Sequence, residues 1–501
     1  MSPSDVSRPG KPETVFDREA EWDALVAFAC DTRPGGGLGV VSGRLRQGKT
    51  YLLKALTAAL GGFYFGAQQA AEGESLRRLG EELAQYTGTA PPSRWRGWED
   101  AVEALLELGD QRPVPVVVDD FPDLVRQSPA LPSIIHSAYR RLRDTGRDNR
   151  PRLLLSGSSL PVMHRLFSAS SPLRELADLE LTLGPLDFRQ AARLWGIDEP
   201  GLALLVHAVV GGTPAYWRYV GNHGPSGPDD FDAWVCRTVL NPRTPLFLEA
   251  HHLLQEETDH WDRALCHSAL AAIASGCSTP GEIAECLGAP LTDASRWLAL
   301  LRENGLLYGE SDAFRPNLIR LRIAEPLLAF EHAVVWPHRS ALEQQEAIEV
   351  WRSVRPVFDS AVADPHFARI CRDWVMDFAD PAVFGAHPAM AAHGSLPDPA
   401  RRAGPDAEAE VAEAEVVARG RADVCSGPLL SVGVARWDEV MDLHHLEHLR
   451  HLLALLAACG EDVTHARPAC YSGVGFTPAL RSAEADGHVV LVDLDRLYRG
   501  R

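Results

Sequence analysis

The chain has 501 residues, of which 46% are hydrophobic and 23% charged, so it is ordinary for a globular protein and too long for one hydrophobic core. Its net charge of −19 argues against tight non-specific binding to nucleic acid or to an anionic membrane. The nine cysteines include no C-x-x-C pair, which argues against a zinc cluster or a disulfide framework. No apolar run approaches the ~18 residues of a membrane span, and residues 1–11 are polar, so we expect a cytoplasmic protein of several domains.

Residues 39–60, GVVSGRLRQGKTYLLKALTAAL, predict a strand, a glycine-framed loop and a helix with leucines at helical spacing. The loop is a complete G-x-x-x-x-G-K-[ST] phosphate loop, for which the alternative is an ordinary glycine-containing turn. Its glycines let backbone amides face a triphosphate, Lys49 would reach the β and γ phosphates, and Thr50 would ligate Mg²⁺. We therefore expect ATP and Mg²⁺ as cofactors, with nucleotide contacts from Gly43, Arg44, Arg46, Gln47, Gly48, Lys49, Thr50 and Tyr51.

Two acids follow the apolar strand predicted at residues 114–118, VPVVV. Phosphate-loop NTPases place an Asp at the end of such a strand beside Mg²⁺, so Asp119 is the predicted metal ligand. Asp120 would then act as a base or orient the hydrolytic water. A strand followed by a polar turn is the alternative, but the preceding phosphate loop favours the functional interpretation.

A further apolar strand at residues 152–155 ends in a Ser/Gly segment. Ligands of open α/β sheets bind at the carboxyl ends of the strands, so Ser156 and Ser158 are predicted to contact the γ-phosphate. The alternative is that they form a simple turn. A strand at residues 179–183 closes the sheet. Alternating strands and helices predict an α/β fold with a parallel sheet covered by helices on both faces.

Several segments together resemble the archaeal-type AAA+ ATPases, close to the STAND NTPases: FDREAEW, GRLRQGKT, VVVDDFPDL, LLLSGSS, LGPLDF and GGTPAYW. The resemblance implies an extra strand between the phosphate-loop strand and the acid-bearing strand. It also implies a helical lid with Gly212 and Pro214 near the nucleotide base, and Arg18 of the first segment joins the expected nucleotide contacts. The family usually has Glu at the position of Asp120, so slow hydrolysis is expected. Arg174 is a displaced candidate for the arginine that contacts the γ-phosphate.

The same resemblance implies a winged helix and a C-terminal restriction-endonuclease-like domain. We expect a tail at 1–14, an ATPase core at 15–187, a lid at 188–258, a winged helix at 259–337, and the nuclease-like domain at 338–501 with a flexible loop at 386–410. In that last domain Glu415 is the acid on the first strand. The second strand has Val434 where the family has Glu and Arg436 where it has Lys, so we expect a nuclease fold without metal chemistry.

Two further patterns give weaker signals. Residues 264–307 have helix-turn-helix spacing, but the predicted recognition helix offers only Arg296 and Arg302 as cations, which favours a structural or protein-contacting role. Residues 444–448, HHLEH, fit the inverted zinc-protease motif. The leucines around them predict an ordinary helix with its histidines on the solvated side, so we do not expect a protease.

The sequence therefore predicts a Mg²⁺-dependent ATPase in which ATP drives a conformational switch that engages a macromolecular partner. The expected partner is an unidentified protein, with DNA binding through the winged helix and self-association left open, and no membrane contact is expected. The alternative is a nucleic-acid-binding regulator or nuclease-derived module in which nucleotide is structural and hydrolysis is slow or absent.

Overall fold

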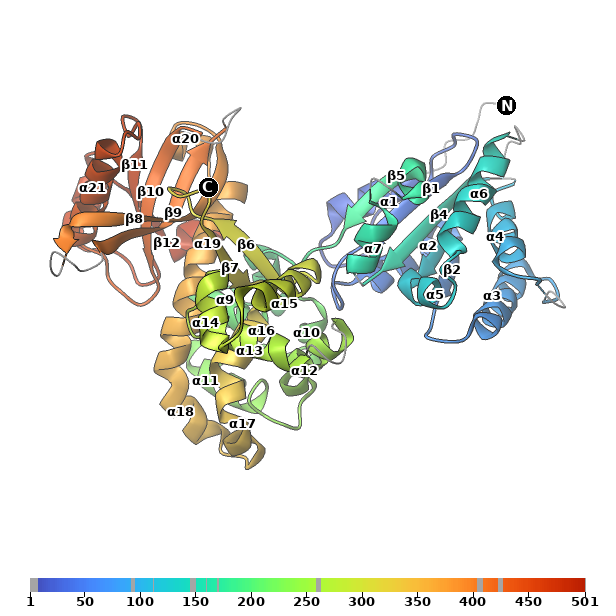
Figure 1. Ribbon diagram of the computed structural model, residues 1–501, viewed down its shortest axis with the longest axis horizontal. Coiled ribbons are helices and arrows are strands. Elements are labelled where there is room, and N and C mark those ends of the chain that lie inside the picture. Colours follow the sequence, from blue (N-terminus) through green and yellow to red (C-terminus); the bar gives the residue numbers. More distant parts are fainter. Residues whose placement is uncertain are drawn as a thin grey trace. The chain divides into compact units, whose positions relative to one another are not determined.

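The protein is described here by a computed structural model covering residues 8–91, 95–110, 112–144, 150–158, 160–168, 171–257, 263–402, 409–421 and 427–500. Half of the predicted tail, residues 1–7, lies outside these ranges. The chain divides into two compact units, Met1–Pro185 and Leu186–Arg501 (Figure 1). Among the described helices, none combines the length and the apolar character that crossing a bilayer requires.

The first unit is built on a five-stranded sheet with the order β2-β3-β4-β1-β5. The strands are β1 (Gly37–Ser42), β2 (Phe63–Gly66), β3 (Val114–Asp119), β4 (Pro151–Gly157) and β5 (Ala177–Thr182). All neighbouring pairs are parallel. The phosphate-loop strand β1 and the acid-bearing strand β3 are separated by β4, which confirms the predicted extra strand and the predicted fold class.

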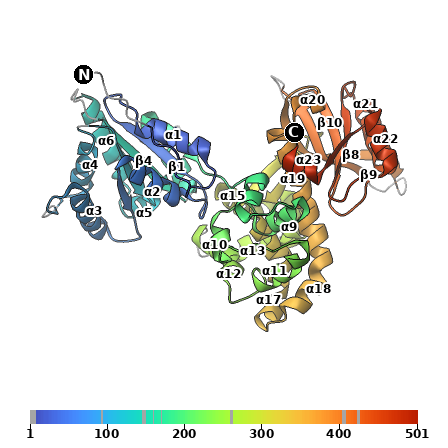
Figure 2. The same ribbon diagram turned by 180° about the vertical axis from the view of Figure 1, so that it is seen from behind.

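Helices cover both faces of this sheet (Figure 2). They are α1 (Glu19–Ala29), α2 (Lys49–Leu60), α3 (Glu72–Thr87), α4 (Trp98–Glu107), α5 (Phe121–Gln127), α6 (Leu131–Asp144), α7 (Leu160–Leu166) and the short 3-10 helix η1 (Pro172–Leu176). Successive strand residues point to opposite faces, so Val40 packs with α3–α6 while Val41 packs with α1 and α2. Burial on both faces explains why the three central strands, β1, β3 and β4, are mostly apolar along their whole length.

The second unit begins with helices, in the region where the sequence predicts a lid. They are α8 (Phe188–Trp195), α9 (Pro200–Val210), α10 (Ala215–Tyr219), η2 (Pro228–Asp230), α11 (Phe231–Arg237) and α12 (Pro245–Glu257). A break at Gly211 and Gly212 separates α9 from α10: Gly211 adopts a φ of 62° and Gly212 lies against the backbone. A Cβ atom on Gly212 would stand 1.8 Å from the carbonyl oxygen of Leu186, so only glycine fits there.

Three helices and a two-stranded antiparallel hairpin follow, in the order that the predicted winged helix requires. They are α13 (Arg263–Ala274), α14 (Pro280–Leu287), α15 (Leu291–Glu303), β6 (Leu307–Ser311) and β7 (Ile319–Ile323). A capping box starts α14, in which Thr279 and Glu282 satisfy each other's backbone amides. The assignment of this segment as a winged helix stays a prediction.

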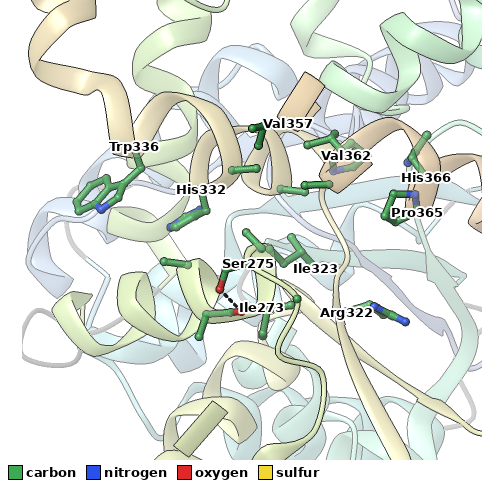
Figure 3. Close-up of a pocket in the computed structure, with 18 of the residues that line it drawn as sticks. Ile273, Ser275, Arg322, Ile323, His332, Trp336, Val357, Val362, Pro365 and His366 are labelled. Carbon is green, nitrogen blue, oxygen red and sulfur yellow. Dashed lines mark hydrogen bonds between the residues drawn. The ribbon is translucent and has the colours of Figure 1, made fainter. Parts of the chain in front are cut away.

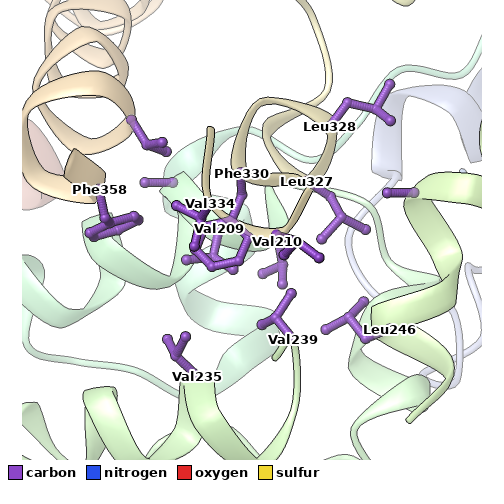
Figure 4. Close-up of a cluster of buried hydrophobic side chains, with 14 of the residues drawn as sticks. Val209, Val210, Val235, Val239, Leu246, Leu327, Leu328, Phe330, Val334 and Phe358 are labelled. Atoms are coloured by element: carbon purple, nitrogen blue, oxygen red, sulfur yellow. The ribbon is translucent and has the colours of Figure 1, made fainter. Parts of the chain in front are cut away.

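A further set of helices connects the hairpin to the last sheet. They are α16 (Pro326–Phe330), the π-helix η3 (Glu331–Val335), α17 (Trp336–Glu343), α18 (Ala347–Phe358), the π-helix η4 (Asp359–Ala363), α19 (Asp364–Asp377) and α20 (Pro381–Phe384). Side chains of the first five of these elements, α16 to η4, share one hydrophobic core with α9, α11 and α12, as Val209, Val235, Leu246, Phe330 and Phe358 show (Figure 4). The helices at 188–257 and at 326–363 therefore form a single packed body, whereas α19 and α20 pack in a separate cluster with the last sheet.

The last part of the second unit holds a mixed five-stranded sheet of order β12-β11-β10-β9-β8. Its elements are β8 (Pro388–Arg402), β9 (Ala409–Gly420), β10 (Leu429–Arg436), α21 (Leu443–Ala458), β11 (Arg467–Ser472), α22 (Pro478–Ala485), β12 (Val490–Asp493) and α23 (Leu494–Arg499). Strands β8, β9 and β10 pair antiparallel, and β10, β11 and β12 pair parallel.

Strand β8 corrects the prediction of a flexible loop at residues 386–410. Residues 388–402 form an edge strand paired with β9, and residues 403–408 lie outside the described ranges. The Ala- and Pro-rich composition of this segment is misleading because Ala392, Ser395 and Asp398 are buried, at 3%, 0% and 1% exposure. Prolines are tolerated here because an edge strand leaves one row of amides unpaired.

Candidate nucleotide-binding site

The phosphate loop connects β1 to α2 and depends on backbone conformations that favour glycine. Gly43 has a φ of 145°, and a Cβ atom there would lie 2.3 Å from the carbonyl oxygen of Leu183. Gly48 has a φ of 94° at the start of α2, and Arg46 between them also has a positive φ of 65°. These three residues curl the chain tightly at the N-terminus of α2, where a helix presents unpaired amides and positive potential.

Lys49 is held inside this curl. Its side chain is buried, with 5% of the residue exposed, and its Nζ donates to the carbonyl oxygens of Gly43 at 2.7 Å and Arg44 at 2.8 Å. Gln47 is buried beside it at 2% exposure. The loop therefore surrounds a fixed ammonium group, which is the arrangement expected of a phosphate site.

The two predicted metal ligands meet at the carboxyl edge of the sheet. Thr50 Oγ1 donates to Asp119 Oδ2 at 2.6 Å, and the backbone N–H of Asp120 donates to the other carboxylate oxygen at 3.1 Å. Asp119 is only 1% exposed. A hydroxyl and a carboxylate in contact offer the oxygen ligands that Mg²⁺ prefers, so these residues fit that ion.

A third residue, Tyr64 of β2, belongs to this cluster and was not predicted. Its hydroxyl donates to Asp119 Oδ2 at 2.9 Å, because β2 pairs with β3 and places Gly66 opposite Asp119. Burial, followed by the charge of Asp119, raises the pKa of Tyr64 well above its usual range, so the hydroxyl stays protonated. The only sequence signal was a tyrosine between two inward phenylalanines in residues 63–65.

Asp120 has an unusual backbone and an altered acidity. Its φ is 53°, in the left-handed region, at the N-terminal boundary of α5. Burial, followed by the charges of Asp119 and Asp123, raises its pKa to about 6, and the charge of Lys49 opposes this rise. A carboxylate held in a strained conformation with a pKa near neutrality is a typical acid–base group.

Ser156 lies at the end of β4, between the two motif strands. It pairs in register with Val41 of β1 and is fully buried, and its Oγ has no hydrogen-bond partner among the described residues. Ser158 follows just beyond the strand and is half-buried. Both therefore stand at the carboxyl edge of the sheet beside the phosphate loop, as predicted.

Other predicted contacts are engaged elsewhere in the first unit. Arg174 pairs with Glu180 of β5, and Arg18 donates to Glu21 at 2.8 Å and to the Gly184 carbonyl at 2.6 Å. Tyr51, which is 49% exposed on α2, donates its hydroxyl to the carbonyl of Thr14 at 3.0 Å. The roles assigned to Arg18, Tyr51 and Arg174 stay predictions.

Gly212 and Pro214 belong to the second unit. Gly212 accepts a backbone hydrogen bond from Leu186 at 2.8 Å, and Pro214 stands at the N-terminal boundary of α10. The adjacent Thr213 lies 3.4 Å from buried Glu325. The close packing of Gly212 against Leu186 explains why a glycine stands there. The proximity of Gly212 and Pro214 to a nucleotide base stays a prediction.

The predicted nuclease-like residues form an ion pair. Glu415 of β9 accepts from Arg436 at 2.7 Å, and Asp364 accepts from the backbone N–H of Trp437 at 2.9 Å. Val434 is buried at 2% exposure. Across the described ranges, no group of three or more His, Cys, Asp or Glu side chains is arranged to hold a metal ion.

The histidines of residues 444–451 lie on helix α21, where a helix was predicted. His445 contacts Asp442 at 3.1 Å, and Nε2 of His451 lies 2.7 Å from Asp398 of β8. His448 approaches the carbonyl of Glu413 at 3.2 Å. These separate contacts tie the helix to the sheet and to its own N-terminus.

No family model and no curated protein matches the sequence. Among solved structures, the chain is similar to a Walker-type ATPase of Pyrococcus abyssi, at 19% identity and a TM-score of 0.49, over 66% of this chain and 99% of that one. It is also similar to the ORC2 protein of Aeropyrum pernix in its ADPNP–ADP complexes, at 16% identity and a TM-score of 0.44, over 70% and 98% of the two chains.

A third similar structure is Cdc6p from Pyrobaculum aerophilum, at 16% identity and a TM-score of 0.31, over 68% of this chain and 97% of that chain. Likenesses this distant say nothing about activity, so the assignment depends on this chain's own residues. Its first unit has the fold of a phosphate-loop NTPase, with Thr50 and Asp119 joined at the carboxyl edge of a parallel sheet.

Proposed function

We propose that this protein binds ATP with Mg²⁺ at residues 43–50 and hydrolyses it, and that the nucleotide state switches its contact with a macromolecular partner. The hydrogen bond between Thr50 and Asp119, 2.6 Å long, is the observation that carries the proposal. It joins residues 69 positions apart in the sequence, both of which the sequence predicts as ligands of the same ion. A glycine-containing turn without a binding function would not require contact between Thr50 and Asp119.

Each residue of the site has a distinct proposed role in binding the nucleotide or the ion. The loop amides and Lys49 hold the phosphates, and Thr50 and Asp119 hold Mg²⁺. Bound there, the ion would neutralise charge on the phosphate oxygens. Tyr64 donates to the carboxylate of Asp119 and so fixes its orientation.

Asp120 is the group proposed to orient and deprotonate the hydrolytic water. Because its pKa is about 6, its carboxylate is mostly ionised at pH 7 and is still basic enough to take a proton. Ser156 offers a buried hydroxyl without a hydrogen-bond partner among the described residues, which suits contact with the γ-phosphate. Asp is one methylene shorter than Glu, so we expect slow turnover.

The proposed switch is supported by the way the predicted lid packs on the terminal domain. Arg189 of α8 donates to the carbonyl of Leu497 at 2.8 Å, and His207 of α9 lies 2.8 Å from His366 of α19. A movement of α8 and α9 would therefore be passed to α23 and α19, the helices that pack on the terminal sheet. We propose that this sheet, a restriction-endonuclease-like domain with Glu415 engaged by Arg436, binds a partner and does not cleave DNA.

A DNA-directed role is not favoured, because the hairpin that would act as the wing packs against β8. The backbone N–H of Ala313 donates to the carbonyl of His393 at 2.8 Å, and Ser395 accepts from Arg320 at 3.0 Å. Asp312, at the hairpin, accepts from the backbone N–H of Ser395 at 3.2 Å. A protein partner is therefore proposed.

Nucleotide affinity tests the binding part of the proposal. With Mg²⁺ and fluorescent ATP, Lys49→Ala should weaken binding by about 100-fold, because a buried charge-assisted contact is lost. Arg140→Ala is the control, since Arg140 is an exposed cation on α6 and its loss should leave affinity unchanged. Equal affinity of wild type and Lys49→Ala would contradict an ATP site at this loop.

A further inference from the structure

Two cysteines of the second unit lie next to each other, although most of helix α14 separates them in the sequence. Cys277 stands in the loop between α13 and α14, and Cys286 lies in the last turn of α14. The thiol of Cys277 donates a hydrogen bond to the sulfur of Cys286. Neither residue is in a disulfide, and Cys277 is half-buried while Cys286 is exposed.

The loop that carries Cys277 is held in place from both sides. The backbone N–H of Cys277 donates to the carbonyl of Ala272 at 3.1 Å, at the end of α13. The carbonyl of Ser278 accepts from the backbone N–H of Leu321 at 2.6 Å, and its Oγ accepts from Arg320 at 3.2 Å, both on β7. The contact between the two thiols therefore connects the end of α14 to a fixed loop.

The surroundings of Cys286 leave it open to small molecules. It lines a cavity of about 1520 Å³, as does Gly276 of the loop that carries Cys277. In the same wall, Oγ of Ser275 donates to the carbonyl of Ala272 at 2.9 Å (Figure 3). A reagent in solution can therefore reach the sulfur of Cys286 without any opening of the fold.

The two thiols have different chemical environments. The hydrogen bond with Cys286, followed by burial and by the charge on Cys286, raises the pKa of Cys277 to about 11, so this thiol stays protonated at neutral pH. Glu282, whose carboxylate accepts from the backbone N–H of Ser278 at 2.8 Å, adds to the rise. The exposed Cys286 is therefore the thiol that a reagent meets first, and Cys277 stands beside it to react next.

A metal site is not favoured at this pair. Among the residues that the structure describes, no three His, Cys, Asp or Glu side chains are grouped to hold an ion, whereas a structural zinc takes four ligands. Two thiols in contact instead have the composition of a disulfide that can form and break.

We propose that Cys277 and Cys286 form a reversible disulfide by exchange with a low-molecular-weight disulfide such as glutathione disulfide. The sulfur of Cys286, as its thiolate, attacks one sulfur of the reagent, the S–S bond of the reagent breaks, and one glutathione thiolate leaves. The sulfur of Cys277 then loses its proton and attacks the sulfur of Cys286 in the mixed disulfide, which releases the second glutathione. The two protons lost by the cysteines end on the two glutathione thiols. The site is separate from residues 43–50, and its existence does not depend on the proposed ATPase.

Mass spectrometry of the full-length protein tests the cross-link after incubation with glutathione disulfide and blocking of the remaining thiols. Cleavage after Glu282 cuts the chain between the two cysteines, so their peptides should stay joined until a reductant is added. In Cys277→Ser the reaction should stop with glutathione attached to Cys286, and Cys286→Ser should form no cross-link. Cys459→Ser, at another exposed cysteine, is the control and should form the same cross-link as wild type.

Amide hydrogen exchange measures what the disulfide does to the fold. Residues 277–287 should exchange about tenfold more slowly in the oxidised protein than in the reduced one, because the cross-link suppresses opening of the loop from α14. Cys277→Ser treated in the same way should show no slowing, which separates the cross-link from modification of Cys286 alone. Separate peptides from the oxidised wild type, or joined peptides from Cys277→Ser, would overturn the proposal. So would a glutathione adduct that persists on Cys286 in the wild type, since Cys277 would then fail to displace it.

Discussion

The hydroxyl of Tyr64 donates a hydrogen bond to Oδ2 of Asp119 at 2.9 Å, on the same oxygen that accepts from Thr50. The carboxylate is thus held from two sides, by the strand next to it and by the first turn of α2. Such outer contacts orient a metal ligand and adjust its affinity for the ion. Tyr64 is therefore a positioning residue of the proposed Mg²⁺ site.

Tyr64→Phe tests this positioning role. Loss of one hydrogen bond should raise the Mg²⁺ concentration for half-maximal ATP turnover by about 3–10-fold, with a smaller effect on turnover at saturating Mg²⁺. Tyr86→Phe is the control, because the Tyr86 hydroxyl donates to the carbonyl of Gly61 at 2.8 Å, away from Asp119. An unchanged Mg²⁺ dependence in Tyr64→Phe would remove Tyr64 from the site.

The pH dependence of turnover should reflect Asp120. Its pKa is raised to about 6, so the carboxylate becomes protonated below that pH and can no longer accept a proton. Turnover should fall about tenfold per pH unit below 6, as expected for one ionised base. A pH–rate profile measures this, and a flat profile between pH 5 and 7 would show that Asp120 is not the base.

The same pKa makes a prediction for stability. The unfolded carboxyl ionises near 3.8 and the folded one near 6, so ionisation costs folding free energy as pH rises through this window. Asp120→Asn should therefore raise the free energy of unfolding by about 1–2 kcal/mol at pH 7 and leave it unchanged at pH 4. Urea unfolding at the two pH values measures the difference, and equal effects at both would contradict it.

Gly212→Ala tests the close approach at the α9–α10 break. The new Cβ atom would lie 1.8 Å from the carbonyl oxygen of Leu186, so we expect a loss of about 2–4 kcal/mol of stability by urea unfolding. Gly281→Ala is the control, because nothing lies within 4 Å of that position in α14 and the change should be neutral or stabilising. A neutral Gly212→Ala would show that the backbone moves freely there.

The contact between the hairpin and β8 depends on Asp312, which is 1% exposed. Asp312→Ala removes the acceptor used by Ser395 and leaves Arg320 without its carboxylate, so it should cost about 3–5 kcal/mol. Amide hydrogen exchange should become faster in β8. Asp438→Ala, at an exposed aspartate, should change stability by no more than about 0.5 kcal/mol. Unchanged exchange in Asp312→Ala would show that the hairpin is held by other contacts.

The phosphate loop and the acids Asp119 and Asp120 were predictable because each motif lies within a short stretch of sequence. The glycines at 43 and 48 and the strand ending in Asp119 impose their conformations locally, and the parallel sheet brings their ends together. Tyr64 could not be found in this way, since its contact with Asp119 depends on the order of strands β2 and β3.

The second unit shows where local patterns fail. Composition suggested a loop at residues 386–410, yet β8 is fixed by its pairing with β9 and by buried Asp312 and Ser395. The common core of the helices at 188–257 and 326–363 arises from contacts between distant segments, as between Val209 and Phe330, and no single segment encodes it. The ion pair between Glu415 and Arg436 likewise joins two strands.

The most direct test of the central claim is ATP turnover with Mg²⁺ in the wild type and in Asp120→Asn, with nucleotide affinity measured on the same samples. The account predicts measurable ATP turnover in the wild type and a turnover rate lower by about 100-fold or more in Asp120→Asn. The two proteins should bind ATP with equal affinity. Tight binding of ATP by the wild type with no turnover would contradict the hydrolysis claim and leave a protein that uses ATP only as a ligand.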